Sequence, residues 1–102
     1  MTKSIAVLAT LDTKGDEAQF IREQLEKLGS RAVLFDIGVI NQPTESADIT
    51  REEIAVAGGK PLADILSNPT REAATPIMAA GTTKILQDLL DAGKIDGAIG
   101  FG

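Results

Sequence analysis

The sequence predicts an α/β domain, a Rossmann-like three-layer fold around a short parallel sheet. The continuous apolar run at residues 4–9 is typical of a strand that is covered on both faces, and residues 31–37 are interpreted as the second strand. Between them, apolar residues recur at spacings of three and four, which indicates an amphipathic helix. The connections are so short that strand, helix and strand form one unit with parallel strands. A chain of 102 residues accommodates one domain of this kind, so we expect residues 1–102 to form a single unit.

The first helix has sequence signals at both of its ends. Thr13, followed three residues later by Asp16, approaches the capping-box pattern, so we expect the helix to begin near Lys14. Gly29 is the residue type that commonly ends a helix. The buried face of the helix is predicted to consist of Ala18, Ile21, Leu25 and Leu28.

The segment after the second strand is predicted to hold a loop and then two short helices. Residues 38–46 lack helical periodicity and are interpreted as the loop. Residues 50–53, Thr-Arg-Glu-Glu, are a capping box that opens a short helix, and Gly58-Gly59 ends it. A further helical turn is expected over residues 61–66, because proline is favoured at the first helical position.

A long helical segment precedes the third strand, and Pro76 interrupts its pattern. Apolar residues recur at roughly helical spacing over residues 70–90. The helix either begins at Thr75, with Pro76 in its first position, or begins near residue 70 and bends at Pro76, because a proline inside a helix removes a hydrogen bond and clashes with the preceding turn. We favour the bent helix. Residues 95–101 are then predicted to form a third strand that is rich in glycine.

The composition excludes several classes of chemistry. The sequence contains no Cys and no His, which removes disulfides, thiolate zinc sites and the Ser-His-Asp and Cys-His catalytic arrangements. Three Phe without Trp or Tyr offer little for stacking nucleic-acid bases, and the net charge of −5 disfavours binding to a phosphate backbone. The first apolar run is too short for a signal peptide or a membrane span. We therefore expect a cytoplasmic protein with no nucleic-acid or membrane partner.

The turn between the first strand and the first helix is the strongest candidate for a ligand site, because open α/β sheets bind ligands where their strands end. The turn combines hydroxyls on Thr10 and Thr13, the cation of Lys14, and Gly15, which lets a ligand approach the backbone. Together with the free amides of a helix start, these groups suit a phosphate. Asp12 is suited either to holding Mg²⁺ through water or to orienting a ribose hydroxyl.

The same turn has a purely structural interpretation, in which Thr13 caps the helix and Lys14 is simply solvated. It matches neither the Walker A sequence nor the Gly-x-Gly-x-x-Gly dinucleotide pattern. Gly100 and Gly102, at the end of the third strand, are expected to bring a second backbone segment to the same ligand. No residue stands out as catalytic.

Three segments in this order, residues 10–15, 48–53 and 96–102, resemble the N-terminal ATP-binding region of the tomato mosaic virus resistance protein-like family. The resemblance covers the whole chain. It implies a two-part protein, with an N-terminal α/β nucleotide-binding region and a C-terminal region similar to a TIM barrel of the phosphoenolpyruvate-dependent hydrolase kind. The phosphate-binding role that it implies falls on Thr10, Asp12, Thr13, Lys14, Gly15, Gly100 and Gly102.

The leading hypothesis is therefore that residues 1–102 form a nucleotide-binding module that prefers ATP, with or without Mg²⁺, and that partners the remainder of its own chain. Since a parallel strand needs a covering helix, we expect the natural protein to continue beyond Gly102. One alternative is a structural or oligomerisation domain, which forms a homo-oligomer such as a dimer or docks onto the rest of the protein. Another is part of an enzyme that acts on a phosphorylated small molecule, with a carboxylate such as Asp12 as the base.

Overall fold

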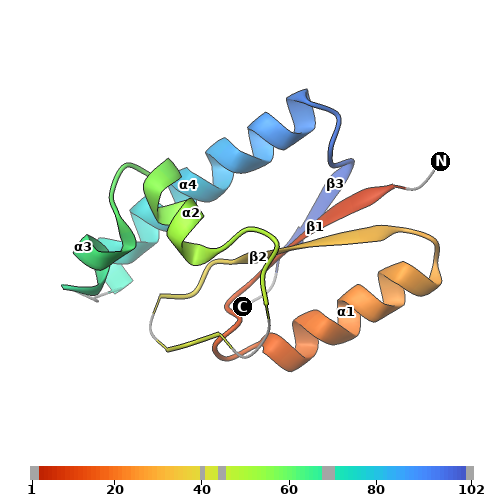
Figure 1. The fold of residues 1–102 in the computed structure, drawn as a ribbon, viewed down its shortest axis with the longest axis horizontal. Helices are drawn as coiled ribbons and strands as arrows, with labels where there is room; N and C mark the ends of the chain where they lie inside the picture. The colour runs from red at the N-terminus through yellow and green to blue at the C-terminus, as the bar shows by residue number, and fades with distance from the viewer. Residues whose placement is uncertain (1–2, 40, 44–45, 68–70, 101–102) are drawn as a thin grey trace.

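The computed structural model describes residues 3–39, 41–43, 46–67 and 71–100 and has three layers (Figure 1). Its elements are β1 (Ser4–Ala9), α1 (Gly15–Lys27), β2 (Arg31–Asp36), α2 (Arg51–Ala57), α3 (Leu62–Leu66), α4 (Arg71–Asp91) and β3 (Gly97–Gly100). The three strands form one parallel sheet, with α1 on one face and α2 and α4 on the other. This arrangement confirms the predicted α/β, Rossmann-like class.

The parallel pairing gathers the carboxyl ends of the strands at one edge of the sheet. β1 is central, in the order β2-β1-β3. Ala9 pairs with Asp36, and Leu8 pairs with Gly100, so the carboxyl ends of the three strands lie side by side. From β1 the chain goes first to β2 on one side and later to β3 on the other. The carboxyl end of β1 is therefore the topological switch point, where open α/β sheets bind ligands.

The strands lie where the sequence predicts them. β1 matches the predicted run, β2 ends one residue earlier than predicted, and β3 occupies the middle of the predicted segment 95–101. The last predicted residue of that strand, Phe101, lies outside the described part of the chain.

Both faces of the sheet bury apolar side chains, most of them aliphatic. On one face Val7, Ala9 and Leu34 pack against Ala18 of α1. The buried cluster on the other face consists of Ala6, Phe35, Ile54, Ala55, Ile65, Ala74, Met78 and Ile95. β1 contributes to both clusters, which explains why its sequence is continuously apolar instead of alternating.

Two predictions about α1 were wrong. Thr13 does not cap the helix: the N-cap residue is Lys14, with no side-chain cap, and the hydroxyl of Thr13 lies 2.9 Å from that of Thr10. Leu28, predicted on the buried face, is 81% exposed, because it is the C-cap residue and stands beyond the last helical turn. Gly29 follows with a φ of 82°, the left-handed conformation expected where a helix ends.

The position of α4 depends on a direct backbone contact with α2. α2 begins with the predicted capping box at residues 50–53. A Cβ on Gly58 would overlap the carbonyl oxygen of Ile77, and a Cβ on Gly81 would overlap that of Ile54. Glycine at both positions therefore lets the two helices touch, and the contact determines how α4 lies over the sheet.

α4 runs through Pro76 as one helix. It begins at Arg71, which confirms the predicted start near residue 70 and contradicts a start at Thr75. The bend at Pro76 stays a prediction. Within the described ranges, no helix combines the length and apolar character needed to cross a membrane.

Replacing Phe35 with Ala should lower the free energy of unfolding by about 3–5 kcal/mol, because this fully buried ring fills the cluster that α2 and α4 cover. Urea denaturation followed by circular dichroism measures the difference. Phe20→Ala is the matched control: Phe20 is 60% exposed on α1, so we expect a change below about 0.5 kcal/mol. Equal losses in the two variants would contradict this placement of the core.

Candidate functional site

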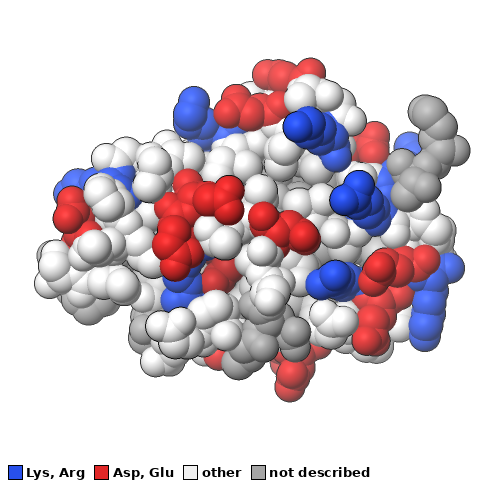
Figure 2. Space-filling model, viewed as in Figure 1, with Lys and Arg blue, Asp and Glu red and all other residues white. Residues whose placement is uncertain are grey.

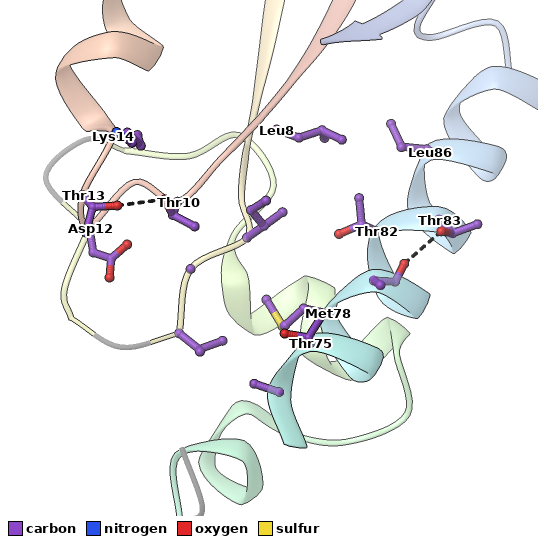
Figure 3. Close-up of a pocket in the computed structure, with 15 residues that line it drawn as sticks. Leu8, Thr10, Asp12, Thr13, Lys14, Thr75, Met78, Thr82, Thr83 and Leu86 are labelled. Atoms are coloured by element: carbon purple, nitrogen blue, oxygen red, sulfur yellow. Dashed lines mark hydrogen bonds between the residues drawn. The ribbon is translucent and has the colours of Figure 1, made fainter. Parts of the chain in front are cut away.

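A cavity of about 850 Å³ opens at the carboxyl ends of β1 and β2, between the sheet and α4 (Figure 3). The β1–α1 turn, the residues directly after β2 and one side of α4 form its walls. Its size falls in the range of cavities that hold a whole small-molecule ligand. The cavity therefore lies at the edge of the sheet where the topology predicts a ligand site.

The polar wall of the cavity is the β1–α1 turn. The amides of Thr13 and Lys14 donate to the carbonyl oxygen of Thr10, at 3.1 and 2.7 Å. The contact between the Thr10 and Thr13 hydroxyls crosses the same turn (Figure 3). Two amides of the turn are therefore already paired, and the expectation that the turn offers free amides is wrong for these two.

The amides without a partner belong instead to the first turn of α1, which follows Lys14 directly but is not part of the cavity lining. Among the described residues, none accepts a hydrogen bond from the amides of Gly15, Asp16 or Glu17, and the helix has no side-chain cap. Unpaired amides at a helix start carry partial positive charge, which the helix dipole reinforces. Lys14 adds a full positive charge at the same place. Together they make this end of the cavity attractive to a phosphate or carboxylate.

The apolar wall is supplied mainly by α4. Met78 and Leu86 of α4 stand across the cavity from Leu8 of β1 (Figure 3). Ile37, which follows β2, also lines the cavity. In the sequence, the apolar residues of this segment indicate a helix by their spacing and nothing about a cavity. The sequence signal for a cavity wall is the set of threonines interleaved with these apolar residues. Thr75, Thr82 and Thr83 also line the cavity.

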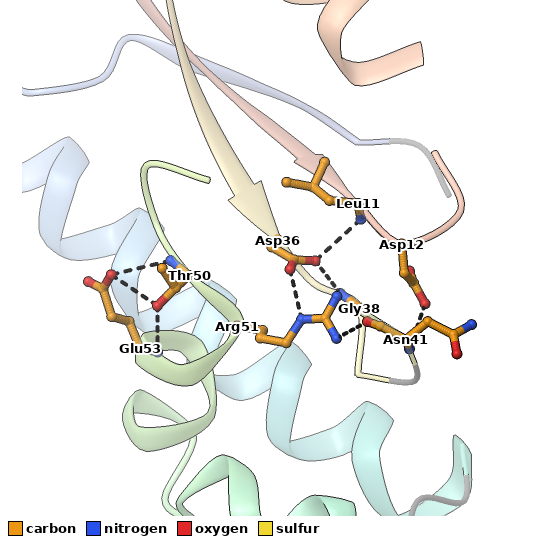
Figure 4. Close-up of polar contacts among 8 residues, drawn as sticks. All are labelled: Leu11, Asp12, Asp36, Gly38, Asn41, Thr50, Arg51 and Glu53. Carbon is orange, nitrogen blue, oxygen red and sulfur yellow. Dashed lines mark hydrogen bonds and ion pairs between the residues drawn. The ribbon is translucent and has the colours of Figure 1, made fainter. Parts of the chain in front are cut away.

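A buried carboxylate joins the segments behind the cavity (Figure 4). Asp36, 1% exposed, accepts hydrogen bonds from the amide of Leu11 at 3.3 Å and from the amide of Gly38 at 3.0 Å. Its other oxygen accepts a bond from Nε of Arg51 at 2.7 Å. Since Arg51 is itself only 6% exposed, water screens the pair little. The carboxylate thus ties the β1–α1 turn, the loop after β2 and the start of α2 together.

A second set of contacts extends this network to Asp12. Nη1 of Arg51 donates to the carbonyl oxygen of Asn41, and the amide of Asn41 donates to Oδ2 of Asp12 at 3.2 Å (Figure 4). Gly38 lies close to both Asp12 and Arg51. A Cβ on Gly38 would stand 2.7 Å from Oδ1 of Asp12 and 3.2 Å from Nη2 of Arg51. Gly38 therefore leaves the space that Asp12 occupies at the rim of the cavity.

The structure brings together four of the predicted site residues. The cavity is lined by Thr10, Asp12, Thr13 and Lys14. Gly15 is buried as the first residue of α1 and does not line the cavity. Within the described ranges no group of three or more acidic side chains is arranged to hold a metal ion, so a Mg²⁺ at Asp12 would need oxygens from a ligand.

Gly100, the last residue of β3, stands apart from the cavity. Gly100 lies at the same edge of the sheet, opposite Leu8, but is not part of the cavity lining. Gly102 lies outside the described residues. A contact of either glycine with a ligand stays a prediction.

Charged side chains of both signs are interspersed on the face of the molecule shown in Figure 2. The whole chain carries 10 basic and 15 acidic residues, and on this face the basic ones form no continuous patch. Among the described residues that line the cavity, Lys14 carries the positive charge and Asp12 carries a negative one.

Fold and cavity together define a Rossmann-like α/β domain with a ligand-sized cavity at the carboxyl edge of its sheet. The chain belongs to the family described as "Uncharacterised protein family (UPF0261) N-terminal domain", which matches residues 3–102. It is 34% identical over 102 residues to a UPF0261 protein of Clostridium tetani, an alignment that covers 100% of this chain and 25% of that protein.

Two further relatives are also UPF0261 proteins and also align with nearly the whole of this chain. A UPF0261 protein of Brucella suis is 30% identical over 98 residues, which cover 96% of this chain and 23% of that protein. A UPF0261 protein of Rhizobium meliloti is 33% identical over 100 residues, which cover 98% of this chain and 24% of that protein. The chain thus spans about a quarter of the length of the curated relatives it matches, and their names state neither a ligand nor an activity. No solved structure matches the chain significantly.

Asp36→Asn should lower the free energy of unfolding by about 3–5 kcal/mol, because it leaves the guanidinium of Arg51 buried without its counter-charge. Glu26→Gln is the control, since Glu26 and Arg22 form an exposed pair at 3.8 Å whose loss should cost less than about 0.5 kcal/mol. Chemical denaturation of both variants tests this. If Asp36→Asn lowered the free energy of unfolding as little as Glu26→Gln does, the buried pair would not hold together the β1–α1 turn, the loop after β2 and the start of α2.

Proposed function

We propose that this domain binds a nucleotide, with ATP preferred, and that the phosphates lie at the start of α1. The observation that carries the proposal is the division of the cavity, which has a polar wall at the β1–α1 turn and an apolar wall at α4. A nucleotide has the matching division, with anionic phosphates at one end and a flat ring at the other. The volume of about 850 Å³ suits a ligand of that size.

The phosphate end would be held by groups of three kinds. The amides of residues 15–17 offer hydrogen bonds aligned with the helix dipole. Lys14 offers a charge-assisted hydrogen bond. The hydroxyls of Thr10 and Thr13 can each turn toward an anionic oxygen, because a hydroxyl both donates and accepts. This combination favours a ligand with several negative oxygens.

Asp12 would act through Mg²⁺. Its carboxylate repels a bare phosphate, whereas a magnesium ion shared with the phosphate oxygens turns that repulsion into attraction. The amide of Asn41 holds one oxygen of Asp12 in place, so the carboxylate is oriented before any ligand arrives. The nucleotide is therefore proposed to bind as its magnesium complex.

The choice of ATP is supported by the resemblance to the ATP-binding region of the tomato mosaic virus resistance protein-like family. Two of the three segments that carry it converge on one edge of the structure: residues 10–15 form the turn, and Arg51, within 48–53, bonds Asp36 behind it. In full-length relatives we propose that the domain works together with the C-terminal part of the chain, in the cytoplasm.

Lys14→Ala should weaken ATP binding about tenfold, the effect of losing one charge-assisted contact to a phosphate. Isothermal titration with ATP and Mg²⁺ measures the affinity. Lys27→Ala is the matched control, because Lys27 ends the same helix, far from the cavity, and its loss should leave the affinity unchanged. Equal affinities for wild type and Lys14→Ala, or no binding to either, would contradict the proposed site.

The second candidate function is assembly, favoured by the exposure of β3. Among the described residues β3 pairs with β1 alone, which leaves its outer edge open, and Ile99 on it is 41% exposed. Open strand edges bind other strands unless they are protected. We propose a second copy of the chain as the occupant of this edge.

If a second copy binds there, light scattering should show a mass that rises toward the dimer with concentration. Ile99→Lys should keep the protein monomeric, since a charge at an edge strand opposes pairing. A wild-type mass that stays monomeric at every concentration would rule this assembly out.

A further inference from the structure

The α4 wall of the cavity carries one polar atom that nothing in the fold satisfies. The hydroxyl of Thr82 is buried and has no hydrogen-bond partner. Of the described buried side-chain atoms, only this oxygen and Nη2 of Arg51 share that condition. Arg51 does not line the cavity, whereas Thr82 does. An unsatisfied buried hydroxyl is unfavourable, so its presence in a ligand-sized cavity points to a partner that the ligand brings.

The neighbouring threonine shows that this condition is specific to Thr82. Thr83 also lines the cavity, but its hydroxyl donates to the carbonyl oxygen of Ala79 at 2.9 Å, the usual arrangement for a helical threonine. In Figure 3 the oxygen of Thr82 points toward the interior of the cavity, opposite the side that holds Lys14. The two residues thus differ in what their hydroxyls are free to bind.

We propose that Thr82 recognises the base of the bound nucleotide. The ring would lie between Leu8 and Ile37 on the sheet side and Met78 and Leu86 on the helix side, where apolar contact suits its faces. An edge atom of the ring, either a nitrogen acceptor or an amino donor, would then bond the hydroxyl of Thr82, which can serve either. This inference rests on the proposed nucleotide function and adds to it the group that selects the ligand.

The arrangement explains how one site would distinguish a nucleotide from any other polyphosphate. The first turn of α1 and Lys14 contact only phosphate and cannot tell which molecule carries it. A hydrogen bond inside a mostly apolar wall can, because a ligand without the matching edge leaves the hydroxyl unpaired. Thr82 would therefore determine specificity, and the start of α1 would supply general affinity for anions.

Thr82→Val tests the proposal, because valine keeps the branched shape and removes only the hydroxyl. Isothermal titration with ATP and Mg²⁺ should show a loss of about tenfold, while inorganic tripolyphosphate, which has no ring, should bind as tightly as it binds the wild type. Thr83→Val is the matched control and should leave both affinities unchanged. The unfolding temperature of unliganded Thr82→Val should equal or exceed that of the wild type, since no hydrogen bond is lost.

The possible outcomes distinguish a failure of base recognition by Thr82 from a failure of nucleotide binding itself. Equal ATP affinity in the wild type and Thr82→Val would overturn base recognition by Thr82 and leave nucleotide binding intact. Equal losses for ATP and tripolyphosphate would also overturn it, because Thr82 would then act on the shape of the whole site. A wild type that binds neither ATP nor tripolyphosphate would overturn the proposed function, and this inference with it.

Discussion

The carboxylate of Asp36 is the constraint on which the geometry of the site depends. It stands at the last position of β2 and joins the amide of Leu11, the amide of Gly38 and the guanidinium of Arg51. These groups come from three segments that are separate in the sequence. Because a buried carboxylate needs such partners to remain stable without water, the segments must stay together. The cavity keeps its shape for that reason.

A second constraint sets the opposite wall. Gly58 and Gly81 bring the backbones of α2 and α4 into contact, so α4 is held by another helix and leaves room above the carboxyl edge of the sheet. The ion pair of Arg51 anchors the start of α2, and α2 in turn positions α4. One continuous set of contacts therefore runs from the β1–α1 turn to the helix that faces it, and both walls of the cavity depend on the same network.

Local signals in the sequence were sufficient for the strands, the capping box of α2 and the position of the turn, because each depends on neighbours a few residues apart. The cap of α1 was mispredicted because Thr13 has a competing partner, the hydroxyl of Thr10, in the same turn. The α4 wall could not be predicted, since the apolar spacing of a helix is the same whether it faces a core or a cavity. The Asp36–Arg51 pair could not be predicted either, because it depends on a tertiary contact between residues that are fifteen apart in the chain.

The central claim is that the start of α1 and the inner face of α4 bind the two ends of one nucleotide. The most direct measurement is a titration of the ¹⁵N-labelled protein with ATP and Mg²⁺, followed by amide chemical shifts. The account predicts that residues 14–17 and 78–83 shift together with a single affinity, while residues 25–32 at the opposite edge of the sheet stay unchanged. Shifts at only one of the two walls, or at residues 25–32 instead, would contradict it.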